Sequence, residues 1–240
     1  MSFARESTYP SRFTFAAQAA VDARAEFLLK TYLHLAGAIA AFVTLEAALL
    51  QTPGIENAIR AVFSLPFSWL LVLGAFMVVS VVANRWAQSA TSVGLQYVGL
   101  ALYVVAEGVI FVPLLYVASQ YGGPSVIPTA GLITLIIFSG LSAIVFITRK
   151  DFSFLRGVLW LGGLVAMGFI VCSLLIGFSL GTVFTVAMIA FAGGWVLYDT
   201  SNVLHHYRIG QHVAASLALF ASIALLFWYV LQLVLSLDRD

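Results

Sequence analysis

Residues 157–198, "GVLWLGGLVAMGFIVCSLLIGFSLGTVFTVAMIAFAGGWVLY", decide the fold of this chain, because all 42 of them are uncharged. A helix needs about 20 apolar residues to cross a hydrocarbon core of about 30 Å. The stretch is therefore too long for one membrane span and about right for two. The turn-forming "GFSLG" at 177–181 is the natural break between them.

The composition of the whole chain is that of an integral membrane protein. Of its 240 residues, 62% are hydrophobic and 9% are charged, whereas soluble domains carry about 25% charged residues. The apolar runs are apolar on all faces and do not alternate as membrane-spanning strands do. A net charge of +1 without a basic tract argues against nucleic acid as a partner. We therefore expect an all-α polytopic membrane protein in the lipid bilayer.

Charged and turn-forming residues divide the chain into seven candidate spans. We expect these spans at residues 27–50, 66–84, 93–118, 126–148, 156–177, 180–204 and 212–237. Residues 1–26 are polar and carry both charge signs, so they form a short tail before a single membrane domain of residues 27–237. The loops between the spans are short. We therefore expect the function to reside in the membrane-embedded helices and in the short segments at their ends.

The basic residues orient the expected bundle. With a cytoplasmic N-terminus, nine basic residues fall on the inner side and two on the outer side, as the positive-inside rule requires. The inner residues are Arg5, Arg12, Arg24, Lys30, Arg85, Arg149, Lys150, Arg156 and Arg208, and the outer ones are Arg60 and Arg239. This seven-span topology places the N-terminus in the cytoplasm and the C-terminus outside.

Four ionisable residues lie inside the expected spans, where such residues are costly and are candidates for function. His34 and Glu46 lie near span ends, and we expect both to reach the headgroups. Glu107 lies about 21 Å along its helix from Val93, close to mid-membrane, where burial favours the neutral acid. Two interpretations stay open for Glu107: a packing hydrogen bond to a neighbouring helix, or a position on an ion or proton path.

Asp199 is the fourth of these residues. If its helix continues to about residue 206, Asp199 lies about 10 Å inside the cytoplasmic end, whereas a helix ending at Thr200 leaves it interfacial. Ser222 lies about 15 Å into the next span, so the two side chains can meet across an antiparallel hairpin. The long side chain of Arg85 comes from the same membrane side and can reach inward to Asp199.

Neither catalysis nor a firm metal site follows from the remaining motifs. "GFSLG" matches the G-x-S-x-G nucleophile pattern, but it lies in a turn between spans rather than between a strand and a helix. We interpret Gly177 and Gly181 as close-packing positions that let the hairpin turn. His205, His206 and His212 are poorly spaced for one metal ion, and the chain has one cysteine, Cys172. We expect no enzyme activity and no cofactor.

The segment "FAGGWVLYDTSNVLHHY", residues 191–207, resembles the signature of the transmembrane Bax inhibitor motif family. The resemblance implies a seven-span protein, here of a bacterial plasma (inner) membrane. Some members of that family are pH-sensitive calcium-leak pathways gated by an aspartate pair, to which an arginine attaches. Others regulate membrane proteins, including a membrane protease in bacteria. Asp199 matches the first aspartate of the pair, and Arg85 is the available candidate for the arginine.

Ser222 departs from the family pattern, because it stands where the resemblance implies the second aspartate. We therefore expect an Asp199–Arg85 ion pair rather than two carboxylates sharing a proton. Asp199, Arg85, Glu107 and Ser222 are the candidate gate residues, with transient Ca²⁺ binding at Asp199 and Glu107 or passage of H⁺. Two functions remain open: a cation leak channel or permease, and a non-transporting regulator of membrane proteins such as a protease.

Overall fold

The computed structural model describes residues 14–64 and 67–238. The sequence predictions that involve Arg5, Arg12, Pro66 and Arg239 lie outside these ranges. Within them the chain folds into eight α-helices and two short 3₁₀ helices, and no residue of these ranges belongs to a named strand. The helices are α1 (Val21–Leu50), α2 (Ile55–Ser64), α3 (Ser68–Ala87), α4 (Val93–Tyr121), α5 (Val126–Thr148), α6 (Leu155–Ile176), α7 (Gly181–His205) and α8 (His212–Leu237); the 3₁₀ helices are η1 (Ala16–Gln18) and η2 (Ile209–Gln211).

Seven helices, all except α2, are long and apolar enough to cross a membrane. The prediction of an all-α polytopic membrane protein with seven spans is thus confirmed. The ends of the helices lie close to the expected ones, and the largest difference is at α1, which begins at Val21 rather than at residue 27. The expected orientation of the two termini across the membrane stays a prediction.

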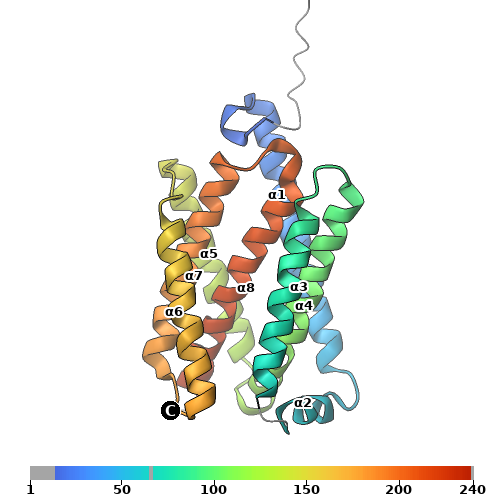
Figure 1. Ribbon diagram of the computed structural model, residues 1–240, viewed down its shortest axis with the longest axis vertical. Helices are drawn as coiled ribbons and strands as arrows, with labels where there is room; N and C mark the ends of the chain where they lie inside the picture. Colours follow the sequence, from blue (N-terminus) through green and yellow to red (C-terminus); the bar gives the residue numbers. More distant parts are fainter. Residues whose placement is uncertain (1–13, 65–66, 239–240) are drawn as a thin grey trace, which may run out of the picture.

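The sequence prediction missed α2, which occupies part of an expected loop. Its apolar residues Ile55, Ile59, Val62 and Phe63 share one face, and Glu56 pairs with Arg60 on another. Figure 1 shows α2 lying across one end of the bundle rather than along it. Such an amphipathic helix suits the membrane interface. We call this end of the bundle the α2 end, and the opposite end, where α7 turns into α8, the α7–α8 end.

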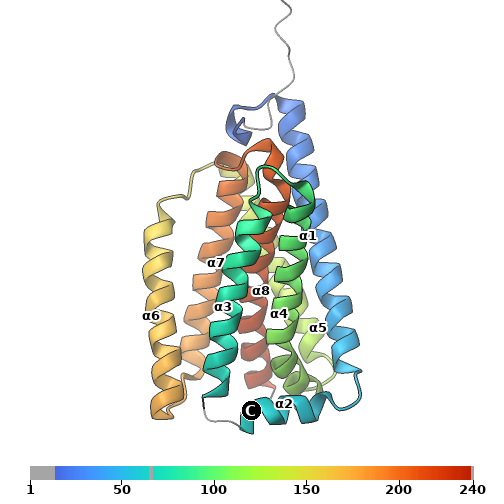
Figure 2. The same cartoon turned by 45° about the vertical axis from the view of Figure 1, so that its right-hand side comes forward.

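Helix α8 is the centre of the bundle. It packs against α1, α4, α5 and α7, and more lightly against α3. Its sequence is apolar on nearly every face, which suits a helix surrounded by other helices. Helix α6 lies at the periphery in both views and packs mainly against α7 (Figures 1 and 2). As a result, α3 and α6 flank α8 without packing closely against each other.

Helices α3 and α4 approach closely because small residues line their contact. A Cβ atom at Gly99 of α4 would lie 2.5 Å from the backbone nitrogen of Ala87 and 2.6 Å from the carbonyl oxygen of Ala83. Ala83 and Ala87 are fully buried on this face of α3. Arg85 lies midway between them in sequence, and at about 100° per residue its side chain leaves from the opposite face of the helix.

The turn between α6 and α7 depends on the backbone freedom of two glycines. Gly177 has a φ angle of 83° and Gly181 a φ angle of 68°, a region that disfavours other residues. Neither glycine has another group within 4 Å of where its Cβ would be. The expectation that these glycines let the hairpin turn is therefore confirmed, whereas the expectation that they pack closely is wrong.

Candidate functional site

A cavity of about 1070 Å³ lies between α3 and the α6–α7 pair, and α4 and α8 also line it. At the α7–α8 end its wall includes Asn202 and Tyr207, and at the α2 end it includes Thr182 and Ser236. Along α8 the lining residues run from Leu217 to Ser236, about 28 Å at 1.5 Å per residue. The cavity therefore extends along most of the thickness of a bilayer core, which is about 30 Å.

Asp199 of α7 and Ser222 of α8 meet on the wall of this cavity. The Ser222 hydroxyl donates a hydrogen bond to Oδ2 of Asp199. Both side chains are buried, with exposed fractions of 8% for Asp199 and 3% for Ser222. The predicted contact across the hairpin is confirmed, and so is the continuation of α7 beyond Thr200 to His205. Asp199 is thus not the solvated end of its helix.

Glu107 of α4 lines the same cavity, deeper in the bundle. Its side chain is 6% exposed and lies beside Tyr103, one turn earlier on α4. Tyr103 is buried as well and lines the cavity together with Glu107 and Asp199. We measure depth as the rise along each helix from the α7–α8 end. Asp199 then lies at a depth of about 9 Å, Ser222 and Tyr103 at about 15 Å, and Glu107 at about 21 Å. The cavity wall therefore carries polar groups at successive depths.

Arg85 is not brought to Asp199. Its side chain is exposed, it forms no ion pair with Asp199, and its neighbour Asn84 lines the cavity instead. The reason is the contact of Ala83 and Ala87 with α4, which turns Arg85 to the opposite face of α3. The prediction of an Asp199–Arg85 ion pair is therefore wrong. It rested only on the length of the Arg85 side chain and on the membrane side from which this side chain comes.

Glu46 of α1 is also placed differently from expectation. Its side chain is 4% exposed, and neither carboxyl oxygen has a hydrogen-bond partner among the residues that the structure describes. It packs near Gly108 of α4, where a Cβ would lie 2.6 Å from Leu45 and 3.5 Å from Glu46. The lack of a side chain at Gly108 therefore lets α1 approach α4 closely. The same approach buries Glu46 instead of letting it reach the headgroups.

The four histidines occupy two separate places at the α7–α8 end. The Nε2 atom of His34 lies 2.8 Å from the Tyr97 hydroxyl, and its ring contacts the His212 ring at a centroid distance of 4.9 Å. His205 and His206 belong to a different cluster, described next. Over the described ranges no three His, Cys, Asp or Glu side chains are grouped as a metal ion would require.

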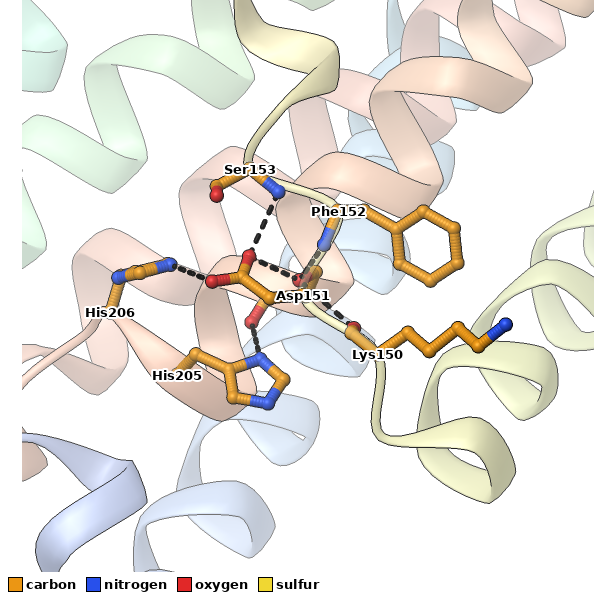
Figure 3. Close-up of polar contacts among 7 residues, drawn as sticks. Lys150, Asp151, Phe152, Ser153, His205 and His206 are labelled. Atoms are coloured by element: carbon orange, nitrogen blue, oxygen red, sulfur yellow. Dashed lines mark hydrogen bonds and ion pairs between the residues drawn. The ribbon is translucent and has the colours of Figure 1, made fainter.

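A second polar site joins the α5–α6 loop to the last turn of α7 (Figure 3). Asp151 is at its centre: Oδ2 lies 3.0 Å from Nε2 of His206, and Oδ1 accepts from the Ser153 backbone amide at 2.8 Å. The Ser201 hydroxyl accepts from the Phe152 amide at 2.8 Å and lies 3.4 Å from Oδ1 of Asp151. We call this arrangement the Asp151 latch; its members are Lys150, Asp151, Phe152, Ser153, Ser201, His205 and His206.

The latch stabilises the ionised form of Asp151. Partial burial opposes ionisation, but hydrogen bonds from Ser153 and His206 outweigh it, so the pKa of Asp151 lies below its usual value. The sequence analysis missed this site, because it treated Asp151 only as part of the charged segment "RKD", residues 149–151, which follows an expected span. A signal was available in the polar residues of both connected segments, but pairing them required knowledge of which loop faces which helix end.

Comparison with known proteins identifies a family match along almost the whole chain and relatives that match 50–72% of it. Residues 24–239 match a protein family described as inhibitor of apoptosis-promoting Bax1. A Pseudomonas aeruginosa protein, PA2604, is 36% identical over 120 residues, which cover 50% of this chain and 53% of that protein. Bax inhibitor 1 of Schizosaccharomyces pombe is 30% identical over 179 residues, covering 72% of this chain and 64% of the relative.

A third relative carries a functional name. The modulator of FtsH protease YccA, from Escherichia coli K12, is 30% identical over 134 residues, which cover 55% of this chain and 61% of that protein. The chain thus spans 53–64% of the length of these three relatives.

Proposed function

Because the chain belongs to the family of inhibitors of apoptosis-promoting Bax1, we propose that it is a membrane protein through which a cation, Ca²⁺ or H⁺, passes by way of the cavity beside α8. The observation that supports this most is the cavity itself, whose wall extends for about 28 Å along α8 and carries Asp199, Ser222 and Glu107. Buried ionisable groups inside a membrane bundle commonly mark ion or proton pathways.

Asp199 is the gate residue in this proposal. It is the carboxylate nearest the α7–α8 end on the cavity wall, and Ser222 holds its orientation through a neutral hydrogen bond. A serine cannot share a proton with Asp199 as a second carboxylate would. Asp199 therefore offers a single binding group, with Glu107 as the second carboxylate deeper on the path. This arrangement suits transient cation binding rather than a closed metal cage, since few ligands hold the ion.

The direct test is flux into liposomes that contain the purified protein and a Ca²⁺ indicator or a pH indicator. Asp199→Asn keeps the shape of the side chain and removes its charge, so we expect at least a tenfold loss of flux. Asp22→Asn is the matched control, because Asp22 is exposed in the first turn of α1, away from the cavity. Equal flux through Asp199→Asn and the parent protein would refute the gate.

A second candidate function is binding of another membrane protein. The E. coli relative is called a modulator of FtsH protease. A groove of about 590 Å³ lies between α1 and α4, and its lining includes the small residues Gly37, Ala41 and Ala101. Small residues let a partner helix approach closely in a membrane. On this proposal a membrane-embedded protease packs a helix along α1 and α4.

Gly37→Leu tests this alternative. Nothing lies within 4 Å of a Cβ at Gly37, so the larger side chain fills the groove without disturbing the fold. Co-purification with an FtsH-type protease should be lost in Gly37→Leu and kept in Gly131→Leu, a glycine of α5 that is equally open. Co-purification unaffected by Gly37→Leu would remove this groove from the interaction.

We place the protein in a bacterial inner membrane, with the α7–α8 end in the cytoplasm. A relative from another E. coli strain is named inner membrane protein YccA. The α7–α8 end carries Arg24, Arg149, Lys150 and Arg208, and the positive-inside rule favours the cytoplasm for such an end. Reporter fusions after residue 238 test this, and a cytoplasmic C-terminal reporter would reverse the orientation.

A further inference from the structure

The cavity beside α8 is divided into a polar half and an apolar half. Asp199, Ser222 and Glu107 lie in the half nearer the α7–α8 end, at depths of about 9–21 Å. The other half, which we call the α2 half, is lined mainly by apolar side chains. Six of these side chains are aromatic: Trp69, Phe76, Phe111, Phe184, Trp228 and Tyr229. The buried carboxyl groups therefore occupy only part of the length of the cavity.

Hydroxyl groups of the α2 half are already bonded to the backbone. The hydroxyls of Ser173, Thr185 and Ser236 each donate to a carbonyl oxygen of their own helix or of the turn that follows it, at 2.8, 3.3 and 2.8 Å. These three groups therefore have no proton left to donate to a ligand. A water molecule in a cavity needs about two to four polar partners. The α2 half thus suits hydrocarbon better than it suits water or a hydrated ion.

The α2 half opens sideways, between α3 and α6. Figure 1 shows these two helices on either side of α8, and they do not pack closely against each other although both line the cavity. Met77 of α3 and Leu174 of α6 line the cavity and are also exposed, at 54% and 39%, so they form its rim. Both helices are membrane spans, and the medium at this rim is therefore the hydrocarbon of the bilayer rather than water.

The length of the α2 half matches a lipid acyl chain. Its lining extends from Leu174, about 3 Å from the α2 end, to Leu225, about 18 Å from that end. A bilayer core of about 30 Å has two leaflets, so the acyl chains of one leaflet extend about 15 Å. Thr182 and Gln232 line the cavity within about 8 Å of the α2 end, where they can contact the polar ester groups of a lipid. A chain from that leaflet therefore fits with its tail directed toward mid-membrane.

Ring contacts hold the wall of the α2 half in place. The indoles of Trp69 and Trp228 are stacked at a centroid distance of 6.2 Å, and the Phe111 ring meets Trp228 edge-on at 5.0 Å. Phe63 of α2 stacks on the other side of this group, against Trp69 at 5.6 Å. Aromatic pairs of these geometries stabilise a packed wall. A wall that is already ordered loses little conformational entropy when a ligand binds.

We propose that the α2 half is a lipid site, which takes one acyl chain of a phospholipid from the leaflet at the α2 end. The chain enters between α3 and α6 and lies against Trp228. It supplies the dispersion contacts that the lining side chains lack when the cavity is empty. While the chain is bound, a hydrated cation does not fit in this half, so the chain blocks the cation path. Only this last consequence rests on the proposed function, whereas the lipid site follows from the lining and the rim.

Fluorescence quenching by brominated lipid tests this site, because bromine atoms on an acyl chain quench a tryptophan that they contact. The full chain is reconstituted in vesicles of phosphatidylcholine that is either unmodified or brominated near the middle of its acyl chains. Four substitutions leave Trp228 as the only tryptophan: Trp69→Phe, Trp86→Phe, Trp160→Phe and Trp195→Phe. We expect the Trp228 emission to be about twofold lower in the brominated vesicles, since a cavity encloses most of the surface of its ligand. Equal emission in the two kinds of vesicle would overturn the lipid site.

Thr185→Phe separates a chain in the cavity from the lipid around the protein. Thr185 lines the α2 half, so the added ring takes the space of the chain and should restore most of the lost emission. Val183→Phe is the matched control on the same helix, because Val183 is 85% exposed and does not line the cavity, and it should be quenched like the parent. Equal quenching in the two variants would assign the effect to the surrounding lipid and overturn the site.

Two further measurements complete the test. Quenching of Trp228 by aqueous acrylamide in place of brominated lipid would show a water-filled α2 half and overturn the lipid site. If the four tryptophan replacements prevent folding, Thr185→Phe and Val183→Phe are compared in the parent chain with its five tryptophans, where the same difference is expected and its absence overturns the site. Quenching of Trp228 without cation flux in any lipid would instead reject the proposed cation path and leave the lipid site standing.

Discussion

Ser222 of α8 donates a hydrogen bond to Oδ2 of Asp199 on α7, and both side chains are almost completely buried. A neutral hydroxyl therefore stands where the family resemblance implies a second carboxylate. Asp199 has a donor that fixes its direction but no neighbour that competes for its proton.

Ser222→Ala removes the donor and leaves a buried carboxyl oxygen without it. We expect the free energy of unfolding to fall by about 1–3 kcal/mol, the cost of an unsatisfied buried polar group. Thermal or denaturant unfolding in detergent measures this loss. Ser216→Ala is the control, because the buried Ser216 hydroxyl bonds only a carbonyl oxygen of its own helix. A smaller loss in Ser222→Ala than in the control would contradict the importance of the Asp199 bond.

Arg85→Gln should change little. Arg85 is exposed on the face of α3 opposite the α4 contact, so we expect its replacement to alter the free energy of unfolding by less than about 0.5 kcal/mol. Flux should also stay within about twofold of the parent, whereas Asp199→Asn should lower it. A loss of flux in Arg85→Gln as large as that in Asp199→Asn would show that the arginine reaches the gate in a state other than this one.

Glu46→Met should stabilise the protein. The Glu46 carboxyl group is buried without a hydrogen-bond partner among the described residues, and an apolar side chain of similar size avoids that cost. We expect the free energy of unfolding to rise by about 1–3 kcal/mol. Glu26→Met, at an exposed position that pairs with Lys30, should change it by less than about 1 kcal/mol. Destabilisation by Glu46→Met would mean that this carboxyl group has a partner in the membrane.

The Asp151 latch predicts a defined loss of stability in acid. The pKa of Asp151 is lowered in the folded protein, so its ionised side chain adds to the free energy of unfolding. This contribution is complete above the unfolded-state pKa of about 3.9 and is lost as the pH falls through the pKa of the folded state. The difference in unfolding free energy between the parent and Asp151→Asn should therefore shrink below about pH 4. Unfolding curves between pH 7 and pH 3 measure this. A difference that persists unchanged into acid would contradict it.

The sequence by itself determined the class of the protein, the number of its spans and the meeting of Asp199 with Ser222. These follow from local quantities: the length of uncharged runs, set by the thickness of the hydrocarbon, and the 1.5 Å rise per residue along two helices joined by a short turn. The resemblance in residues 191–207 also indicated the family to which the chain belongs.

Only the tertiary structure decided where Arg85, Glu46 and Asp151 lie. Arg85 faces outward because Ala83 and Ala87 pack on Gly99, Glu46 is buried because Gly108 lets α1 approach α4, and Asp151 meets His206 because α6 lies beside α7. In each case the deciding contact comes from a helix distant in sequence. Hydropathy and spacing give the depth of a side chain in the membrane, but the direction in which it points depends on helix packing.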